Sequence, residues 1–209
     1  MVRRLLFLCS CAALVVLALV PVNAAAKIGI SISFFSGAVG PVASGSAHWT
    51  NTASNDADPF SVQIDVSDGS GAPNFFSSFG GIDFHHVPAS APATPPAFDF
   101  MADKSAASGG SPRLVIQFSD GGDMELRPLA WTATTWTHED GSSTDWDVHS
   151  PTCPFVFETS YAAGLACHAG ASVTGAFIVS DSGWLSAPYT NWIDNIQYAG
   201  TTISQPSDN

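Results

Sequence analysis

Tryptophan side chains are the first residues in this sequence whose type and spacing point to chemistry. The chain has six Trp residues, and Trp131, Trp136 and Trp146 fall in or near a polar, turn-rich region. A flat aromatic ring can stack on the C–H face of a sugar, while neighbouring Asp, Asn or Gln side chains bind the sugar hydroxyls. The competing interpretation is that these rings pack in the core or at its rim. The three Trp residues are therefore the candidate ligand-binding residues.

An acidic stretch overlaps the same region. Residues 138–149 begin and end with His and contain four acids, which are Glu139, Asp140, Asp145 and Asp147. Calcium binds several carboxylate and carbonyl oxygens at once, so these four side chains could hold it, with Asp120 and Asp123 as further donors. The stretch does not match the EF-hand pattern. An ordinary solvated turn is the alternative, because Asp and Gly are common in turns.

Two cysteines, Cys153 and Cys167, remain once the first 26 residues are set aside. In an oxidising compartment such a pair forms a disulfide, which here would close a loop of roughly 15 residues. A metal site that also uses His168 is the alternative, but no fourth ligand stands at a familiar spacing.

Catalytic signatures are missing from the sequence. It has no Gly-x-Ser-x-Gly elbow, no His-Glu-x-x-His motif and no phosphate-binding loop. A glycosidase needs two carboxylates across a cleft, and no such pair stands out among the Asp residues and the three Glu residues. We therefore predict no catalytic residue, and a glycan-active enzyme is kept only as an alternative.

The first 26 residues have the order of a secretory signal peptide. Arg3 and Arg4 precede an apolar run at residues 5–19, and small residues follow Pro21. The run is shorter than the roughly 20 residues that a membrane-spanning helix needs, and no later stretch is long and apolar enough to span a membrane. We expect a secreted, extracellular protein.

Removal of residues 1–26 would leave 183 residues with four basic and 18 acidic side chains, a net charge of −14. This charge excludes nucleic acids and anionic lipid surfaces as partners, because both would be repelled. The oligomeric state does not follow from the sequence.

Strand signals recur along the chain, whereas long stretches with the apolar spacing of a helix are absent. Apolar residues alternate with small or polar ones at residues 28–34 and 60–66, which is typical of strands with one buried face. Further strands are expected at residues 81–87, 98–101, 114–118, 124–126, 132–137, 155–157, 173–179 and 192–198. Asp and Gly at residues 120–123 predict a hairpin turn.

The expected fold is an all-β, antiparallel, jelly-roll-like β-sandwich with about nine to eleven strands, one disulfide and little helix. One or two helical turns are expected after Thr159, which would cap them. Loops are expected at the proline-rich residues 88–96 and the Gly-rich residues 104–112. The sequence contains no internal repeat, so residues 27–204 form a single domain and residues 205–209 a frayed tail.

Near the end of the chain, residues 173–184 lead into Trp192-Ile193-Asp194-Asn195-Ile196. These residues resemble the last strands of secreted bacterial jelly-roll modules. An Ile-Asp-Asn-Ile core of this kind is similar to the final strand of carbohydrate-binding modules of the galactose-binding-like and concanavalin-like kinds. Residues 118–122 (Phe-Ser-Asp-Gly-Gly) and 181–185 (Asp-Ser-Gly-Trp-Leu) also resemble segments of secreted bacterial proteins of uncharacterised function. The resemblance implies a fold and assigns no ligand residue.

Two functions compete on these grounds. The first, which we favour, is a secreted non-catalytic binding module for an extracellular glycan. The second is a structural or adhesive protein of the cell envelope that has no small ligand. Exposed rings at Trp131, Trp136 and Trp146 would favour the first function, and buried rings would favour the second.

Overall fold

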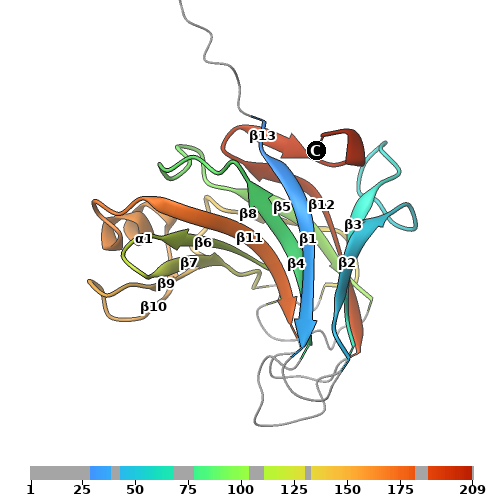
Figure 1. Cartoon of the computed structure of the whole chain (residues 1–209), viewed down its shortest axis with the longest axis horizontal. Helices are drawn as coiled ribbons and strands as arrows, with labels where there is room; N and C mark the ends of the chain where they lie inside the picture. Colours follow the sequence, from blue (N-terminus) through green and yellow to red (C-terminus); the bar gives the residue numbers. More distant parts are fainter. Residues whose placement is uncertain are drawn as a thin grey trace, which may run out of the picture.

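In the computed structural model, the described residues form thirteen strands in two antiparallel sheets (Figure 1). The structure describes residues 29–38, 43–67, 78–103, 111–129, 133–181 and 188–208. Within these ranges the helices are one α-helix of seven residues and one 3-10 helix of three. The all-β sandwich predicted from the sequence is confirmed. The predicted signal peptide lies outside the described residues.

The larger sheet has seven strands. In spatial order they are β1 (Ser31–Ala38), β4 (Ser78–His85), β11 (Val173–Asp181), β6 (Arg113–Phe118), β7 (Asp123–Leu126), β9 (Trp146–His149) and β10 (Val156–Thr159). The predicted hairpin joins β6 to β7, and its turn places Gly121 at a φ of 85°. Glycine adopts this left-handed conformation without steric cost.

The smaller sheet has six strands. In spatial order they are β2 (Ser46–Thr50), β3 (Ser61–Val66), β12 (Tyr189–Tyr198), β5 (Ala97–Ala102) and β8 (Thr137–Asp140), with β13 (Thr201–Ile203) also paired to β12. The chain crosses repeatedly between the two sheets, so strands far apart in sequence become neighbours. The strand β12, for example, lies between β3 and β5.

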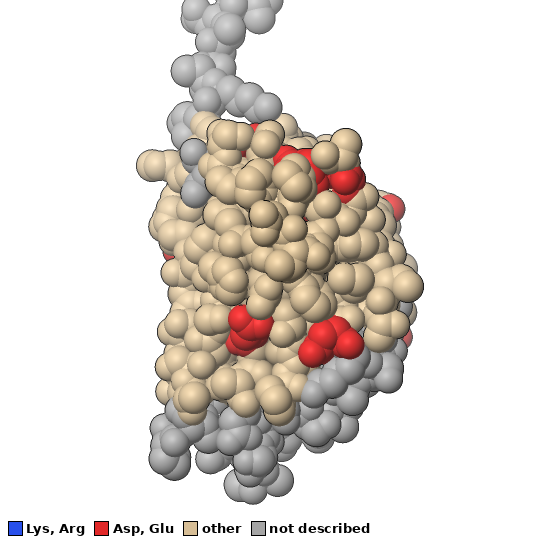
Figure 2. Space-filling view, turned by 90° about the vertical axis from the view of Figure 1, so that its right-hand side faces the viewer, with Lys and Arg blue, Asp and Glu red and all other residues tan. Residues whose placement is uncertain are grey.

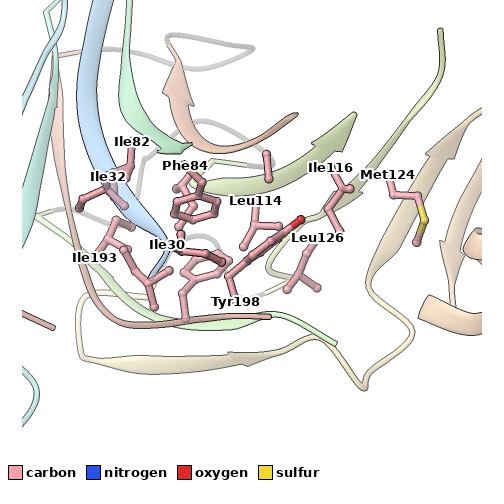
Figure 3. Close-up of a cluster of buried hydrophobic side chains, with 14 of the residues drawn as sticks. Ile30, Ile32, Ile82, Phe84, Leu114, Ile116, Met124, Leu126, Ile193 and Tyr198 are labelled. Atoms are coloured by element: carbon pink, nitrogen blue, oxygen red, sulfur yellow. The ribbon is translucent and has the colours of Figure 1, made fainter. Parts of the chain in front are cut away.

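The core lies between the sheets and is built by the alternation of side chains along the strands. Ile32, Ile82 and Leu114 enter it from the larger sheet, and Ile193 and Tyr198 enter it from the smaller one (Figure 3). All five side chains are at most 4% exposed. Each large apolar side chain buried in this way contributes about 1.5–3 kcal/mol of transfer free energy.

The disulfide predicted from the sequence is confirmed. Cys153 and Cys167 are bonded, with their Cα atoms 5.6 Å apart. The bond ties the loop after β9 to the end of helix α1 (Tyr161–Cys167). This helix is the predicted short one, but its N-cap is Ser160, whose hydroxyl accepts the Ala163 N–H. The prediction of Thr159 as the cap is wrong by one residue, because Thr159 pairs with Trp146 as the last residue of β10.

Several elements differ from those expected. The strands β2, β9 and β13 were not predicted, because each is short, and β2 and β9 carry His, Asp or Trp in place of a clear apolar pattern. The strand expected at residues 132–137 overlaps β8 only at Thr137; residues 130–132 lie outside the described part. The tail from residue 205, expected to fray, contains the 3-10 helix η1 (Pro206–Asp208), and the Asp208 carboxylate accepts the N–H groups of Ser204 and Gln205. The proline-rich loop at residues 88–96 is as expected.

Candidate ligand-binding face

The three predicted Trp residues do not share one exposed face. Trp146 is 0% exposed. Its indole N–H donates to the Gly141 carbonyl over 2.8 Å, and its ring packs 5.0 Å from that of Tyr161. The structure therefore corrects its predicted role: Trp146 is a core residue on which no ligand can stack. Trp131 lies outside the described residues.

Trp136 is half-buried and immediately precedes β8. The first residue of β8, Thr137, pairs with Phe100 of β5. The backbone of Trp136 therefore lies at the edge of the smaller sheet, next in line to Met101. Of the three predicted Trp residues, it alone stays a candidate for ligand binding within the described part of the chain.

The four carboxylates predicted to bind calcium do not form one site, although Glu139 and Asp145 lie close together. Glu139 pairs with Phe98, a core residue, so its side chain points inward, and it hydrogen-bonds to Asp145. Asp140 is exposed and accepts hydrogen bonds from the backbone and hydroxyl of Ser142 in its own turn. Glu139 and Asp140 separate because residues next to each other in a strand point to opposite faces of the sheet.

Asp147, the fourth predicted calcium ligand, belongs to β9 in the larger sheet. It is buried, and its carboxylate lies 2.9 Å from Nη2 of Arg127. It also accepts the backbone N–H of Glu158. An arginine already balances this carboxylate, so it is not available to a calcium ion shared with residues 139–145.

A different group comes close to a metal-binding arrangement. Among the described residues, ligand atoms of Asp123, Glu125 and His149 lie within 4.8 Å of one another on the outer face of the larger sheet. His149 Nδ1 is 3.0 Å from the Asp123 carboxylate, and Arg113 Nε is 3.4 Å from that of Glu125. Burial raises the pKa of Glu125, while Arg113 acts against that rise. The group can bind a cation only in competition with this arginine.

An outward-facing Trp lies in the smaller sheet instead. Trp192 stands in the middle of β12, next to Ile193, which is 0% exposed in the core, and successive side chains of a strand point to opposite faces. Trp192 is half-buried, and its Nε1 is buried without an acceptor among the described residues. Solvent therefore reaches only carbon atoms of the indole.

Trp192 is not among the site residues predicted from the sequence. A usable signal was present, since Trp192 alternates in phase with the polar residues Thr190 and Asp194 and out of phase with Ile193. That pattern predicts a wet face that carries an aromatic ring. It does not indicate which residues of other strands lie beside the ring.

Pairing across the sheet sets the neighbours of Trp192. His48 of β2 pairs with Gln63 of β3, Gln63 pairs with Trp192, and Trp192 pairs with Met101 of β5. Paired residues on adjacent strands point to the same face. The four side chains therefore form one row across the outer face of the sheet.

One side of this row carries the carboxylate of Asp65. It accepts hydrogen bonds from the Ser46 hydroxyl at 3.0 Å, the Thr190 hydroxyl at 2.7 Å and the Gln63 amide at 3.0 Å. The donors come from β2, β12 and β3 itself. These contacts hold Asp65 in place beside Trp192.

The other side of the row carries two carboxylates that lie directly opposite each other, Asp99 of β5 and Asp194 of β12. They are 5% and 1% exposed. The Asn55 and Asn195 side-chain amides each donate to Asp99 over 2.8 Å, and His138 Nδ1 lies 2.6 Å from it. The backbone N–H groups of Asn55 and Asn195 donate to Asp194.

A β-bulge makes part of this arrangement possible. The pairing of β12 with β5 shifts between Asp194 and Gln197, and Asn195 there adopts a φ of 48°. Asn tolerates this left-handed conformation better than most residues. The bulge lets the side chains of both Asp194 and Asn195 approach Asp99, because bulges redirect side chains within a strand.

We call this surface the Trp192 face; its members are His48, Gln63, Asp65, Asp99, Met101, His138, Thr190, Trp192 and Asp194. The six strands of its sheet contain no Lys or Arg. Figure 2 looks at the side of the molecule that carries β2 and β3, and among the described residues it shows acidic groups there but no basic ones. The face thus combines an aromatic ring, hydrogen-bonding side chains and negative charge.

Within the described residues, no helix has the length and apolar character needed to cross a bilayer. Comparison of the chain with protein-family models and with curated proteins gives no match.

Proposed function

We propose that this chain is a secreted glycan-binding module and that the Trp192 face is its binding surface. The observation that supports this most is the half-buried, outward-facing Trp192, with only ring carbons accessible, set in a row between His48, Gln63 and Met101. An apolar ring surface with hydrogen-bonding groups around it suits a sugar, which has an apolar C–H face and a rim of hydroxyls.

The two sides of the row supply the polar part of such a site. Asp65 on one side and Asp99 with Asp194 on the other are held by neighbouring side chains and backbone groups. Groups that are already fixed lose little conformational entropy when a ligand binds. Of the three, Asp65 stays partly exposed and can accept hydrogen bonds from sugar hydroxyls, whereas Asp99 and Asp194 are buried and hold the side chains around them in place.

A structural or adhesive role is the alternative, and the orientation of the aromatic residues bears on it. Among the three Trp residues predicted from the sequence, the burial of Trp146 favours that role. The outward orientation of Trp192 favours the glycan-binding role.

Replacement of Trp192 tests the proposal. Wild-type chain and Trp192→Ala would be compared by affinity electrophoresis in polysaccharide gels and on a glycan array. Loss of a Trp at the centre of a binding surface typically costs about 2 kcal/mol or more, which corresponds to a roughly thirtyfold weaker Kd. We expect Trp192→Phe to retain part of the affinity, because a ring remains available for stacking.

The matched control is Phe157→Ala, which removes another accessible ring, 59% exposed, from β10 at the edge of the opposite sheet. Affinity should be unchanged in this variant. Circular dichroism would confirm that each variant keeps its fold. If the wild-type chain binds nothing across a broad array, the glycan-binding role fails and the structural or adhesive role replaces it.

A further inference from the structure

The acidic side chains of the two sheets differ in how their charge is balanced. Arg113 and Arg127 are the only Lys or Arg residues in the described ranges, and both belong to the larger sheet or its loops. Arg113 forms an ion pair with Asp181 and lies 3.4 Å from Glu125, and Arg127 lies 2.9 Å from Asp147. Three carboxylates of the larger sheet therefore have an arginine partner within the protein: Asp181, Glu125 and Asp147.

Carboxylates of the Trp192 face have almost none. Asp65 and Asp194 accept hydrogen bonds from hydroxyl, amide and backbone N–H groups, all of them neutral. Of the donors to Asp99, only His138 can carry a positive charge. The negative charge on this face is therefore largely uncompensated within the described part of the chain.

Two exposed acids extend this charge along the edge of the face. Asp103 follows β5, and its carboxylate accepts the Thr190 N–H at 3.1 Å, next to Asp65. Asp56 lies near Asp194. Burial raises the pKa of Asp194, and the negative charges of Asp56 and Asp99 raise it further, against the hydrogen bonds from Asn55 and Asn195. The carboxylates on this side of Trp192 thus repel one another.

From this imbalance we infer that the glycan bound by the Trp192 face carries free amino groups, as in a polymer of deacetylated amino sugars. The inference rests on the proposed glycan-binding function and specifies its ligand class. An ammonium group on the sugar supplies the positive charge that the described residues of this face lack, and an indole ring also attracts cations. Polymers of uronic acids or sulfated sugars would meet like charge and be repelled.

Three oligosaccharides of equal length, one positively charged, one neutral and one negatively charged, provide the test. The chain without residues 1–26, the predicted signal peptide, would be titrated calorimetrically with a glucosamine hexamer, an N-acetylglucosamine hexamer and a galacturonic acid hexamer, at a pH where the glucosamine is protonated. We expect the glucosamine hexamer to bind about tenfold or more tightly than its acetylated counterpart, a difference of about 1.4 kcal/mol. The galacturonic acid hexamer should not bind. The preference should shrink as salt is added, because salt screens exposed charges.

Charge-removing variants assign the preference to this face. The double variant Asp65→Asn/Asp103→Asn keeps an acceptor oxygen in each side chain and removes two charges from the surroundings of Thr190. We expect it to lose most of the preference for glucosamine. Asp83→Asn is the matched control, because the Asp83 side chain is 48% exposed on β4 of the other sheet. This control should keep the full preference.

The outcomes distinguish a failure of the amino-sugar inference from a failure of the glycan-binding function on which it rests. If no hexamer binds, and no glycan on a broad array binds either, the glycan-binding function itself fails. If the acetylated hexamer binds as tightly as the glucosamine hexamer or more tightly, and Trp192→Ala loses this binding, the glycan-binding function stands. The amino-sugar inference is then overturned. An equal loss of glucosamine binding in Asp83→Asn and in the double variant would mean that a polycation adheres to the whole acidic protein, which also overturns it.

Discussion

Replacement of Glu139 by Gln should make the protein more stable than the wild type at alkaline pH and should change its stability little at acid pH. Glu139 is 5% exposed in β8 and points toward the core. One of its carboxylate oxygens has no hydrogen-bond partner among the described residues. Burial raises the pKa of Glu139 from 4.5 to about 8, and the neighbouring carboxylates Asp145 and Asp140 add to the rise.

The sign of the effect follows from proton linkage. Below pH 4.5 the carboxyl is protonated in both the folded and the unfolded chain, so its contribution to stability is fully present. Between pH 4.5 and about 8 only the unfolded chain ionises, so the free energy of unfolding falls as the pH rises. Above this window both states are ionised and the loss is complete.

The size of the effect follows from the same two pKa values. A pKa of about 8 in the folded chain against 4.5 in the unfolded chain corresponds to an upper limit of roughly 5 kcal/mol. Because Glu139 shares a hydrogen bond with Asp145 and the structure can relax, we expect roughly 3–5 kcal/mol. The amide that replaces the carboxyl in the variant cannot ionise. The difference in stability between Glu139→Gln and the wild type should therefore grow by this amount from about pH 4 to about pH 9.

Urea unfolding at several pH values measures this difference. Glu158→Gln is the matched control, because it removes the same charge from an exposed side chain. If the difference between Glu139→Gln and the wild type does not change between about pH 4 and about pH 9, then Glu139 is ionised in the folded chain at neutral pH. The burial argument would then be refuted.

Two further predictions concern stability. Replacement of Cys153 and Cys167 by Ser should lower the free energy of unfolding in urea by about 3 kcal/mol, since the bond closes a loop of roughly 15 residues in the unfolded chain; a variant as stable as the wild type would contradict this. Trp146→Ala should cost about 3–5 kcal/mol, because the side chain is 0% exposed. By contrast, Trp192→Ala should cost much less, and equal losses in the two Trp variants would show that Trp192 is part of the core.

Local residue patterns were enough to predict much of the fold. The alternation at residues 28–34 and 60–66 indicates half-buried strands, and β1 and β3 are found there. The pair Cys153 and Cys167 predicts its own bond, because no other Cys remains beyond the apolar N-terminal stretch. These features depend on residues within one strand or on a count, so the sequence by itself determined them.

The candidate site depends on which strands become neighbours. Trp146 and Trp192 both stand close to Asp in short polar and apolar alternations, yet one lies in the core and the other on the outer face. The alternation of polar and apolar residues shows that a strand has two different faces. Which face meets the second sheet is set by the packing of the whole molecule.

The same reason explains the acidic residues. Four acids close together in sequence were predicted to form one site, but Asp147 and Glu139 belong to different sheets. Asp99 and Asp194, which are 95 residues apart in sequence, lie directly opposite each other because β5 pairs with β12. Strand order and register are long-range properties that arise when all strands bury their apolar faces together, so only the tertiary structure decided where the carboxylates of this protein meet.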